Sequence, residues 1–220
     1  MTILITAGPT YERIDPVRFI GNYSSGKMGL ALAAECASRG MEVSLVLGPV
    51  TIQSPVFNNP HIHITRVESA QQMFDAAARI FPHCHAAILC AAVADFTPVS
   101  VASQKIKREG DELVLRLKPT RDIAAHLGTM KRTDQVLAGF ALETNDEQTN
   151  AQSKLNRKNL DFIVLNSMND ANATFGYDTN KITIIDHSGS NAYPLKPKTQ
   201  CAKDIVDKLL ITAKNKLKTK

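Results

Sequence analysis

Several lysines of this sequence stand at spacings that suit phosphate binding. Lys27 follows the small residues Ser24-Ser25-Gly26, and Gly21 lies five residues before Gly26. This is one residue short of a P-loop, which needs Ser or Thr where Met28 stands, and the segment before it, Ile14–Arg18, is no clean strand. We therefore expect free amides that open a helix and can hold a phosphate, with an ordinary helix start as the alternative.

Three further lysines belong to regular patterns. Lys154 and Lys158 are four residues apart and share one helix face, which suits a phosphate pair or an ordinary solvated face. Lys105 lies in an alternating polar and apolar segment, where a solvated strand charge is the alternative to a contact with an anionic ligand.

Other side chains could orient a ligand. The neutral amide of Asn22 can donate to an acyl oxygen without being a nucleophile, although Asn is also common in turns. Arg18 suits a two-pronged phosphate contact or a surface salt bridge. Asp95 follows an apolar strand and suits a ribose, base or metal contact, or it simply opens a loop; Phe140 is a core residue by default.

Strand and helix patterns alternate along most of the chain. Buried strands are expected at Thr2–Thr6, Glu42–Leu47, Ile62–Val67, Ala86–Ala94, Val136–Leu142 and Phe162–Leu165. Helices are expected at Met28–Arg39, from the cap Ser69 to about Phe81, at Asp122–Met130, Glu147–Asn159 and Thr199–Lys216. The order predicts an α/β fold, Rossmann-like, with a mostly parallel sheet and helices on both faces.

Two antiparallel additions interrupt this order. Lys105–Arg108, the turn Glu109–Glu112 and Leu113–Leu117 predict a basic β-hairpin that forms a flap over an anionic ligand, within about residues 98–118. Lys181–Asp186 and Asn191–Leu195 predict an edge hairpin around Ser188-Gly189. We expect a single domain over residues 1–220 that ends in a basic helix at about 199–216.

Composition excludes several classes of protein. The net charge of +5 comes from the segment after Tyr193-Pro194, whose eight lysines and two aspartates make it +6, so a nucleic-acid partner is not expected. No apolar run approaches the roughly 20 residues of a membrane span, and no signal peptide is visible. The four scattered cysteines indicate reduced thiols and a cytoplasmic protein.

In such a sheet, ligands bind beyond the carboxyl ends of the strands. The first loop there, Thr6–Thr10, is not the glycine-rich dinucleotide fingerprint, and the second strand ends without an acidic residue for a ribose. An oxidoreductase of the Rossmann type, with a nucleotide or a flavin, is therefore the second hypothesis, and we expect no flavin in this chain.

An ordered set of segments resembles the phosphopantothenoylcysteine synthetase family from about residue 2 to residue 196. The segments are Ile5–Thr10, Asp15–Asn22, Ser24–Gly29, Ala91–Asp95, Lys105–Lys107, Gly139–Thr144, Lys154 with Lys158, and Asn159–Asp161. The resemblance implies a ligase that joins 4′-phosphopantothenate to cysteine through an acyl-nucleotide, with CTP as the usual nucleotide and Mg²⁺ as cofactor. It also implies a homodimer, and a flavin-dependent decarboxylase that is fused or separate.

The resemblance also implies roles for individual residues. Asn22 and Lys105 would act on the acyl-nucleotide, Arg18, Asn22 and Ala92 would contact the phosphopantothenate, and Asp95 is the candidate metal ligand. The implied nucleotide-binding residues are Gly8, Ser24, Ser25, Gly26, Lys27, Leu89, Cys90, Ala91, Asp95, Lys105, Arg121, Asp122, Ile123, Ala124, Phe140, Lys154 and Lys158. Many family members have Asn-Pro-Asp where this chain has Thr120-Arg121-Asp122, which leaves the choice between CTP and ATP open.

Overall fold

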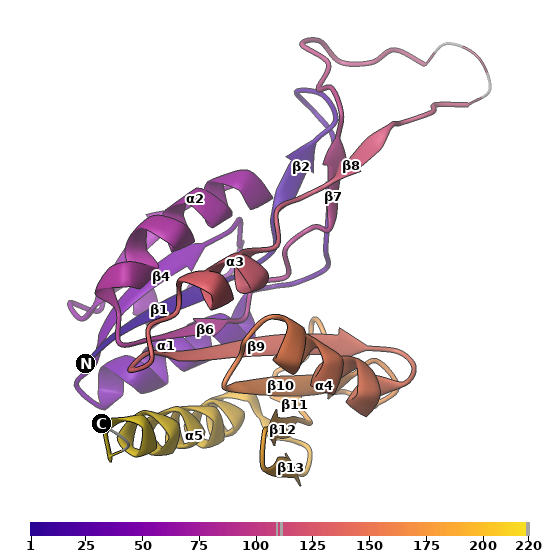
Figure 1. The fold of residues 1–220 in the computed structure, drawn as a ribbon. Helices are drawn as coiled ribbons and strands as arrows, with labels where there is room; N and C mark the ends of the chain where they lie inside the picture. Colours follow the sequence, from indigo (N-terminus) through magenta and orange to yellow (C-terminus); the bar gives the residue numbers. More distant parts are fainter. Residues whose placement is uncertain (109, 111, 219–220) are drawn as a thin grey trace.

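An eight-stranded sheet forms the centre of the computed structural model, which describes residues 1–108, 110 and 112–218 (Figure 1). Its strand order is β13-β12-β10-β9-β6-β1-β4-β5, with six parallel strands and an antiparallel pair, β12 and β13, at one edge. The bounds are β1 (Thr2–Ala7), β4 (Glu42–Leu47), β5 (Ile62–Arg66), β6 (Ala86–Leu89), β9 (Val136–Glu143), β10 (Phe162–Ser167), β12 (Thr183–Asp186) and β13 (Gly189–Ala192). The predicted fold class is confirmed.

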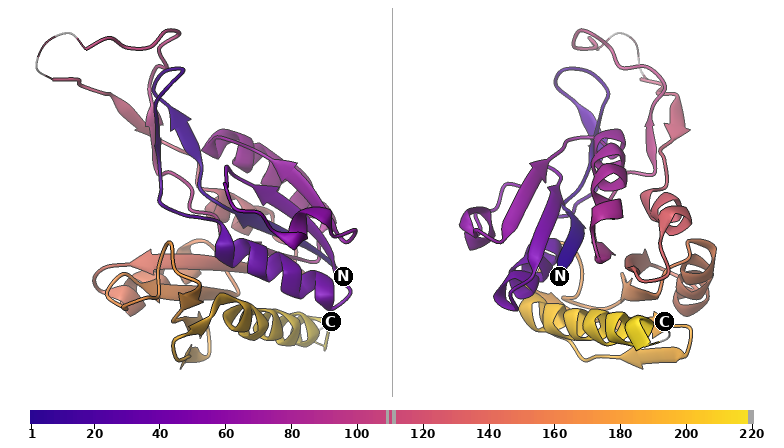
Figure 2. Two further views of the ribbon diagram at one scale, coloured as in Figure 1. Left: turned by 180° about the vertical axis from the view of Figure 1, so that it is seen from behind. Right: turned by 60° about the vertical axis from the view of Figure 1, so that its left-hand side comes forward.

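Helices cover both faces of the sheet because the strands bury side chains alternately on each side. Ile3 and Ile5 of β1 pack in one apolar cluster with residues of α1 (Lys27–Ser38) and α5 (Lys198–Lys218). Leu4, between them, belongs to a second cluster with α2 (Ala70–Ile80), α3 (Ile123–Met130) and α4 (Glu147–Arg157). Figure 2 shows α1 and α5 lying against each other below the sheet. Two short 3₁₀ helices are η1 (Pro55–Asn58) and η2 (Phe81–His83).

The helix starts follow their capping residues. Ser69 caps α2 as predicted, and the structure adds a capping box in which Gln72 takes part. Asp122, which was expected to be the first residue of its helix, instead caps α3 and accepts a hydrogen bond from Ala125 N at 3.0 Å.

After β5, at one edge of the sheet, the chain returns past β4 and β1 and forms β6 on the other side of β1. The connections that follow β1 and β6 therefore lead toward opposite edges of the sheet. Such a switch point opens a crevice at the carboxyl ends of the strands. The strand expected at Ala86–Ala94 ends at Leu89, because β1 turns away at Gly8 (φ 80°). The following residues continue as a loop that pairs irregularly with this turn, through Ala92 N to Gly8 O and Thr10 N to Ala92 O.

An arm of two hairpins projects from this body (Figures 1 and 2). One hairpin pairs β2 (Tyr11–Arg13) with β3 (Phe19–Gly21), and the other pairs β7 (Phe96–Pro98) with β8 (Leu117–Pro119). The sequence predicted only a polar loop for the first hairpin. Its strands are short, and the stacked rings of Tyr11 and Phe19, 3.8 Å apart, join them.

The flap was predicted as a hairpin of Lys105–Arg108 with Leu113–Leu117, and this strand pairing is wrong. Strand pairing occurs at its base, between β7 and β8, and the described residues between Val99 and Arg116 form no strand. Residues 109 and 111 of the predicted turn lie outside the described residues. The apolar side chains of the expected strands, such as Val114 (75% exposed), face solvent, and an isolated hairpin with an uncovered apolar face is marginal.

The edge hairpin is confirmed with shifted ends. β12 and β13 pair around Ser188, while residues on either side form a second small ladder between β11 (Thr179–Asn180) and β14 (Lys196–Pro197). The last helix, predicted for Thr199–Lys216, spans Lys198–Lys218.

Candidate active site

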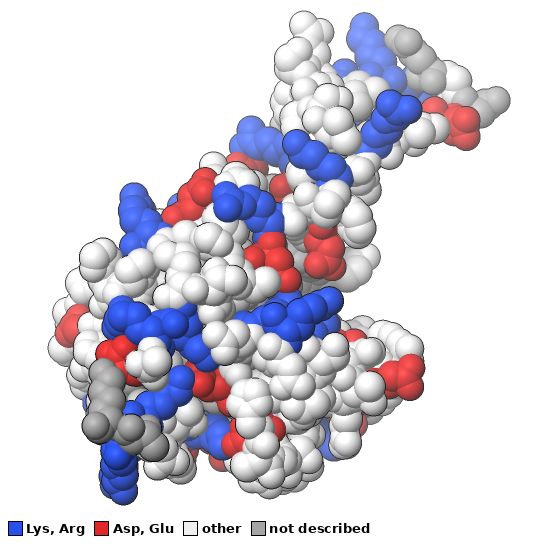
Figure 3. All heavy atoms as spheres, in the orientation of Figure 1, with Lys and Arg blue, Asp and Glu red and all other residues white. Residues whose placement is uncertain are grey.

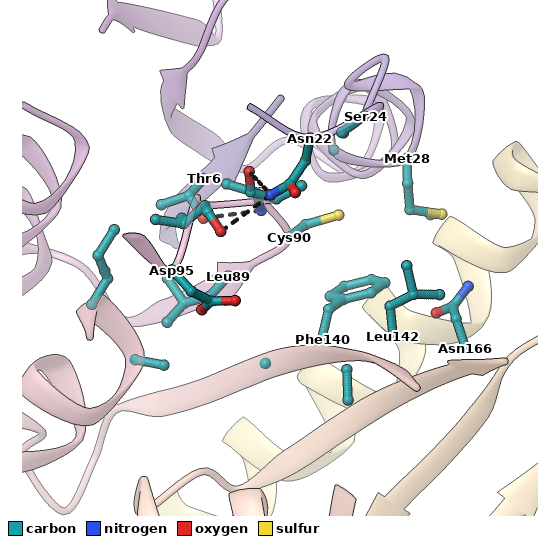
Figure 4. Close-up of a pocket in the computed structure, with 18 of the residues that line it drawn as sticks. Thr6, Asn22, Ser24, Met28, Leu89, Cys90, Asp95, Phe140, Leu142 and Asn166 are labelled. Carbon is teal, nitrogen blue, oxygen red and sulfur yellow. Dashed lines mark hydrogen bonds between the residues drawn. The ribbon is translucent and has the colours of Figure 1, made fainter. Parts of the chain in front are cut away.

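A cleft of about 820 Å³ opens at the carboxyl ends of β1 and β6 and extends over β9 to α4 (Figure 4). Five predicted stretches, far apart in the sequence, meet in its walls. The predicted residues that line it are Asn22, Ser24, Ser25, Gly26, Lys27, Leu89, Cys90, Ala91, Ala92, Asp95, Arg121, Asp122, Ile123, Ala124, Phe140, Lys154 and Lys158.

The start of α1 forms one end of the cleft. Gly26 is its N-cap with φ 78°, and an added Cβ would stand 2.7 Å from Val50 Cγ1, so glycine is needed for both conformation and space. Gly29 lets the helix approach β1, since a Cβ there would meet Ala7 Cβ at 2.3 Å. Because the first-turn amides have no partner within the helix, this end of the cleft suits a phosphate.

Three lysines of the cleft are each paired with a carboxylate. Nζ of Lys27 lies 2.7 Å from Asp178 Oδ1, Nζ of Lys154 lies 2.5 Å from Glu143 Oε1, and Nζ of Lys158 lies 3.0 Å from Asp122 Oδ2. Figure 3 shows positive and negative side chains meeting along the hollow that crosses this face. The lysines thus surround the cleft, and an anionic ligand would compete with three carboxylates for them.

These pairs change the acidity of two of the carboxylates. The hydrogen bond from Lys27 lowers the pKa of Asp178. Burial would raise the pKa of Asp122, but hydrogen bonds from the Ala125 amide and from Lys158 lower it overall. Both groups are therefore carboxylates at neutral pH, and both pairs are ionic.

Asn22 is held by the loop that follows β6. Its Nδ2 donates to Ala92 O at 3.0 Å and to Val93 O at 3.2 Å (Figure 4). Both amide hydrogens are used, so the atom that Asn22 offers to a ligand is its Oδ1, an acceptor. A donor was expected here from the sequence, and the two carbonyls are the reason for the difference.

Asp95 stands at the other end of the same loop, exposed to the cleft. Among the described residues no group of three or more His, Cys, Asp or Glu could hold a metal ion by itself. Mg²⁺ is commonly bound through one or two carboxylates together with substrate phosphates. One carboxylate beside a cleft that suits phosphates therefore fits a magnesium–nucleotide complex.

The segment before α3 is fixed from both sides. Thr120 donates to Ala94 O at 2.7 Å through Oγ1 and to Asp95 O at 2.9 Å through its amide. The guanidinium of Arg121 lies 3.6 Å over the ring of Phe74 in α2. The residue that departs from the resemblance thus has a partner of its own.

Comparison with known proteins agrees with this geometry. Residues 1–212 match the family described as DNA/pantothenate metabolism flavoprotein C-terminal domain. The chain belongs to this family. The resemblance to phosphopantothenoylcysteine synthetases is confirmed, and the chain is a homologue of the C-terminal synthetase region of CoaBC.

Two curated family members show how much of a longer protein is matched. The chain is 56% identical over 209 residues to a cysteine/cysteine sulfinic acid decarboxylase from an unknown prokaryotic organism, covering 94% of this chain and 57% of that protein. It is 40% identical over 210 residues to the coenzyme A biosynthesis bifunctional protein CoaBC of Vibrio vulnificus (strain YJ016), covering 94% of this chain and 51% of that protein. The chain therefore spans about half the length of the curated relatives it matches.

Two solved structures share the fold. The C-terminal domain of CoaBC superposes with a TM-score of 0.81 at 38% identity, over 97% of this chain and 96% of that one. A Cab2 mutant, H337A, in complex with phosphopantothenate-cysteine superposes with a TM-score of 0.79 at 17% identity, over 99% of this chain and 88% of that one. At that identity the second likeness concerns the fold alone.

Three predicted site residues lie outside the cleft walls. Gly8 is buried beneath the cleft, where it turns the chain out of β1. Arg18 lies in the arm, where its guanidinium bonds to Asp15 and to Ile106 O. Lys105 lies exposed on the flap. A contact of Arg18 or Lys105 with a ligand thus depends on how the arm meets a cleft.

The structure adds residues that no sequence pattern indicated. Asn166 of β10 lines the cleft beside Phe140 and Leu142 (Figure 4), and its buried Oδ1 has no hydrogen-bond partner among the described residues. Asn180 fixes this orientation, because its Oδ1 accepts from Lys181 N at 3.0 Å and from Asn166 Nδ2 at 2.5 Å. A buried acceptor without a donor is costly and suits a ligand that brings one.

Lys198, at the start of α5, also lines the cleft. It donates to the carbonyls of Thr174, Tyr177 and Thr179, and thereby fixes the loop opposite α1. Burial and the neighbouring charge of Lys27 lower the pKa of Lys198.

The lysine-rich end of the chain is largely used within the fold. Lys196, Lys208 and Lys216 pair with Asp204, Asp186 and Asp161. This leaves less free charge for a nucleic acid than the composition suggests.

Among the described residues no helix has the length and apolar character to span a bilayer. Burial raises the pKa of the Cys36 and Cys90 thiols to about 12 and that of Cys84 and Cys201 to about 11, which matches unreactive thiols.

Proposed function

We propose that this chain joins 4′-phosphopantothenate to cysteine through an acyl-nucleotide, with CTP as the preferred nucleotide. The observation that supports this most is the meeting of the five predicted stretches in one cleft, with a helix N-terminus at one end and lysines along its walls. This arrangement suits a nucleoside triphosphate. Family membership supports phosphopantothenate as the carboxylate substrate and cysteine as the amine substrate.

In the first half-reaction the phosphopantothenate carboxylate attacks the α-phosphorus of CTP, and the bond to the β-phosphate breaks to release pyrophosphate. Negative charge builds on the phosphates during this step. The amides of Ser25–Gly29 and the ammonium groups of Lys27, Lys154 and Lys158 are placed to offset it. Magnesium, with Asp95 as the candidate ligand, would supply further charge neutralisation when bound.

In the second half-reaction the cysteine amine attacks the acyl carbon, CMP leaves with the bridging oxygen, and the amine loses a proton. Asn22 Oδ1 is oriented to accept from the incoming N–H, since the two carbonyls hold Nδ2. Lys105 would donate to the charge that develops on the acyl and phosphate oxygens. Ala92 and Arg18 would contact the phosphopantothenate.

The surface of the arm favours a homodimer. Its exposed large apolar side chains have no cover in one copy; they are Val17, Phe19, Tyr23, Phe96, Val99, Val101, Leu113, Val114 and Leu117. Large apolar side chains that stay uncovered in one copy suit an interface with a second copy. A second copy on the arm would also bring Arg18 and Lys105 toward a partner's cleft, which accounts for their place outside their own.

Two other surfaces are less suitable for a dimer. In the stretch Val50–Pro60, Val56 is buried and Val50, Ile52 and Phe57 pack against the core of the same chain. The edge hairpin at Lys181–Leu195 presents the exposed polar strand β13. We expect light scattering to show a dimer that the double variant Phe19→Asp, Val114→Asp converts to monomers.

The relative with 56% identity gives a second candidate. Its name describes a decarboxylase of cysteine and cysteine sulfinic acid, and the matched region covers 57% of that protein. The two candidates share cysteine and differ in product, because the ligase releases pyrophosphate and the decarboxylase releases carbon dioxide. For the ligase we further propose a cytoplasmic location and a flavin-dependent decarboxylase as a fused or separate partner.

Pyrophosphate release tests the proposal. The purified chain is mixed with Mg²⁺, 4′-phosphopantothenate and either CTP or ATP, with and without cysteine. We expect release that requires phosphopantothenate and is faster with CTP, and a thiol product only when cysteine is present. Absence of release with either nucleotide, together with carbon dioxide from cysteine or its sulfinate, would favour the second candidate.

A further inference from the structure

Asp15 is a fully buried carboxylate in a part of the molecule that otherwise projects into solvent. It follows β2 at the turn of the first arm hairpin, and only 1% of it is exposed. A buried charge must be paired and hydrogen-bonded to be tolerated, so its partners indicate what it holds in place.

One oxygen of Asp15 closes the hairpin turn. Oδ1 accepts from Val17 N at 2.8 Å and from Arg18 N at 2.9 Å. This is a local turn that Asn could also form, and it accounts for half of the carboxylate only.

The other oxygen reaches the flap. Oδ2 accepts from Arg18 Nε at 3.0 Å and from Ile106 N at 3.1 Å, 91 residues further along the chain. Arg18 Nη2 in turn donates to Ile106 O at 2.7 Å. Asp15 and Arg18 therefore bind both backbone groups of Ile106, as a neighbouring strand would.

The amide of Ile106 belongs to the planar peptide unit that begins at Lys105. Fixing that amide fixes the direction in which the chain leaves Lys105. A second tie, from Ala102 N to Ile14 O at 3.0 Å, holds the same stretch four residues earlier. Because the described residues between Val99 and Arg116 form no strand, these ties are what positions this side of the flap.

We infer that Asp15 is a positioning residue for ligation: with Arg18 it clamps Ile106 and so sets the place of Lys105 relative to the acyl-nucleotide in a partner's cleft. The inference rests on the proposed function for its chemical consequence and on the hydrogen bonds alone for its structural one. The clamp also explains why Arg18 lies in the arm. Its Nη1 takes part in neither contact and stays available to a phosphate.

The test variant is Asp15→Asn, which keeps an acceptor for the turn but puts an amide donor against the donors of Arg18 and Ile106. Glu12→Gln is the matched control. Glu12 lies in the same hairpin, is 4% exposed, and accepts from Ala70 N at 2.7 Å on the body, away from the flap. Both variants disturb a buried carboxylate, and only the first releases Ile106.

Two measurements separate the clamp from the chemistry. Hydrogen exchange of peptides covering residues 100–108, with no ligand present, should be faster in Asp15→Asn than in wild type and unchanged in Glu12→Gln. The pyrophosphate burst should stay within about threefold of wild type, while cysteine-dependent consumption of the acyl-nucleotide slows by roughly tenfold to a hundredfold. The double variant with Lys105→Gln should be no slower than Lys105→Gln alone, because both act through one group.

Equal exchange rates in Asp15→Asn and wild type would overturn the inference. It would also be overturned if Asp15→Asn and Glu12→Gln slowed both half-reactions to the same extent. If wild type releases no pyrophosphate with any nucleotide, the proposed function fails while the exchange measurement still decides the clamp.

Discussion

Lys27 Nζ of helix α1 lies 2.7 Å from Asp178 Oδ1, on the loop that crosses the opposite side of the cleft. The same ammonium group reaches Gly176 O at 3.3 Å. Three neighbours in this loop, Ala173, Thr174 and Phe175, line the cleft. The lysine expected to bind phosphate therefore also ties down the loop beside it, so loop and ligand share one cation.

Replacing Asp178 by Asn should tighten nucleotide binding. The carboxylate is 87% exposed, and exposed ion pairs contribute little, so we expect the dissociation constant of CTP to fall by about two- to fivefold. Lys27→Gln should raise it. Isothermal titration calorimetry measures both, with Asp170→Asn, whose partner Lys181 lies outside the cleft walls, as control. Weaker binding by Asp178→Asn would show that the loop holds the nucleotide instead of competing for Lys27.

Replacing Asn166 by Leu should affect stability and binding in opposite directions. The substitution removes a buried acceptor that has no donor among the described residues. It also removes the hydrogen bond to Asn180 Oδ1, which keeps the amide of Lys181 as a donor, so the melting temperature without ligand should stay equal or rise. Binding of CTP should weaken by about tenfold, since a ligand donor loses its acceptor. Thermal melts with and without CTP report both effects. A fall in melting temperature with unchanged CTP binding would make Asn166 a structural residue only.

Many of the residues that line the cleft could be predicted from the sequence because they lie at strand ends and helix starts. Strand β4 was predicted with its observed bounds, and Ser69 caps α2 as predicted. Lys154 and Lys158 share a helix face that meets the cleft. Local periodicity and capping determine such features.

The sequence was insufficient where contacts come from distant segments. The alternation around Lys105 indicates strands, but nothing local states that an uncovered apolar face leaves them unformed. Nor does it state that Asp15 would reach Ile106. Asn166 carried no signal because its neighbour Asn180 lies on a different strand.

Acid should destabilise the edge hairpin through Asp186. Burial would raise the pKa of Asp186, but hydrogen bonds from Lys208 and Ser188 lower it to about 2, from an ordinary value of 3.8. A carboxylate whose pKa is lowered by folding stabilises the protein above the unfolded pKa, and this contribution disappears as pH falls from about 4 to about 2. The shift corresponds to about 2 kcal/mol.

Asp186→Asn tests this, because Asn resembles the protonated acid. Urea unfolding should show the variant less stable by about 2 kcal/mol at pH 7, with the difference shrinking at pH 4 and again at pH 3. Asp207→Asn, on α5 with a side chain that is 58% exposed, should cost less than about 1 kcal/mol at every pH. A constant difference for Asp186→Asn across this range would mean that its charge contributes nothing.

Lys105→Gln should separate the two half-reactions. Three other lysines, Lys27, Lys154 and Lys158, remain in the cleft to hold the nucleotide, so binding and the pyrophosphate burst should persist. Losing a donor to developing charge costs on the order of 3 kcal/mol, about a hundredfold in rate, so the acyl-nucleotide should accumulate on the enzyme. Lys107→Gln, the exposed lysine on the other side of Ile106, is the matched control and should turn over normally. Rapid quenching followed by mass spectrometry identifies the bound species. Normal turnover of Lys105→Gln would assign this lysine to the solvated surface, and complete loss of nucleotide binding would make it a phosphate anchor.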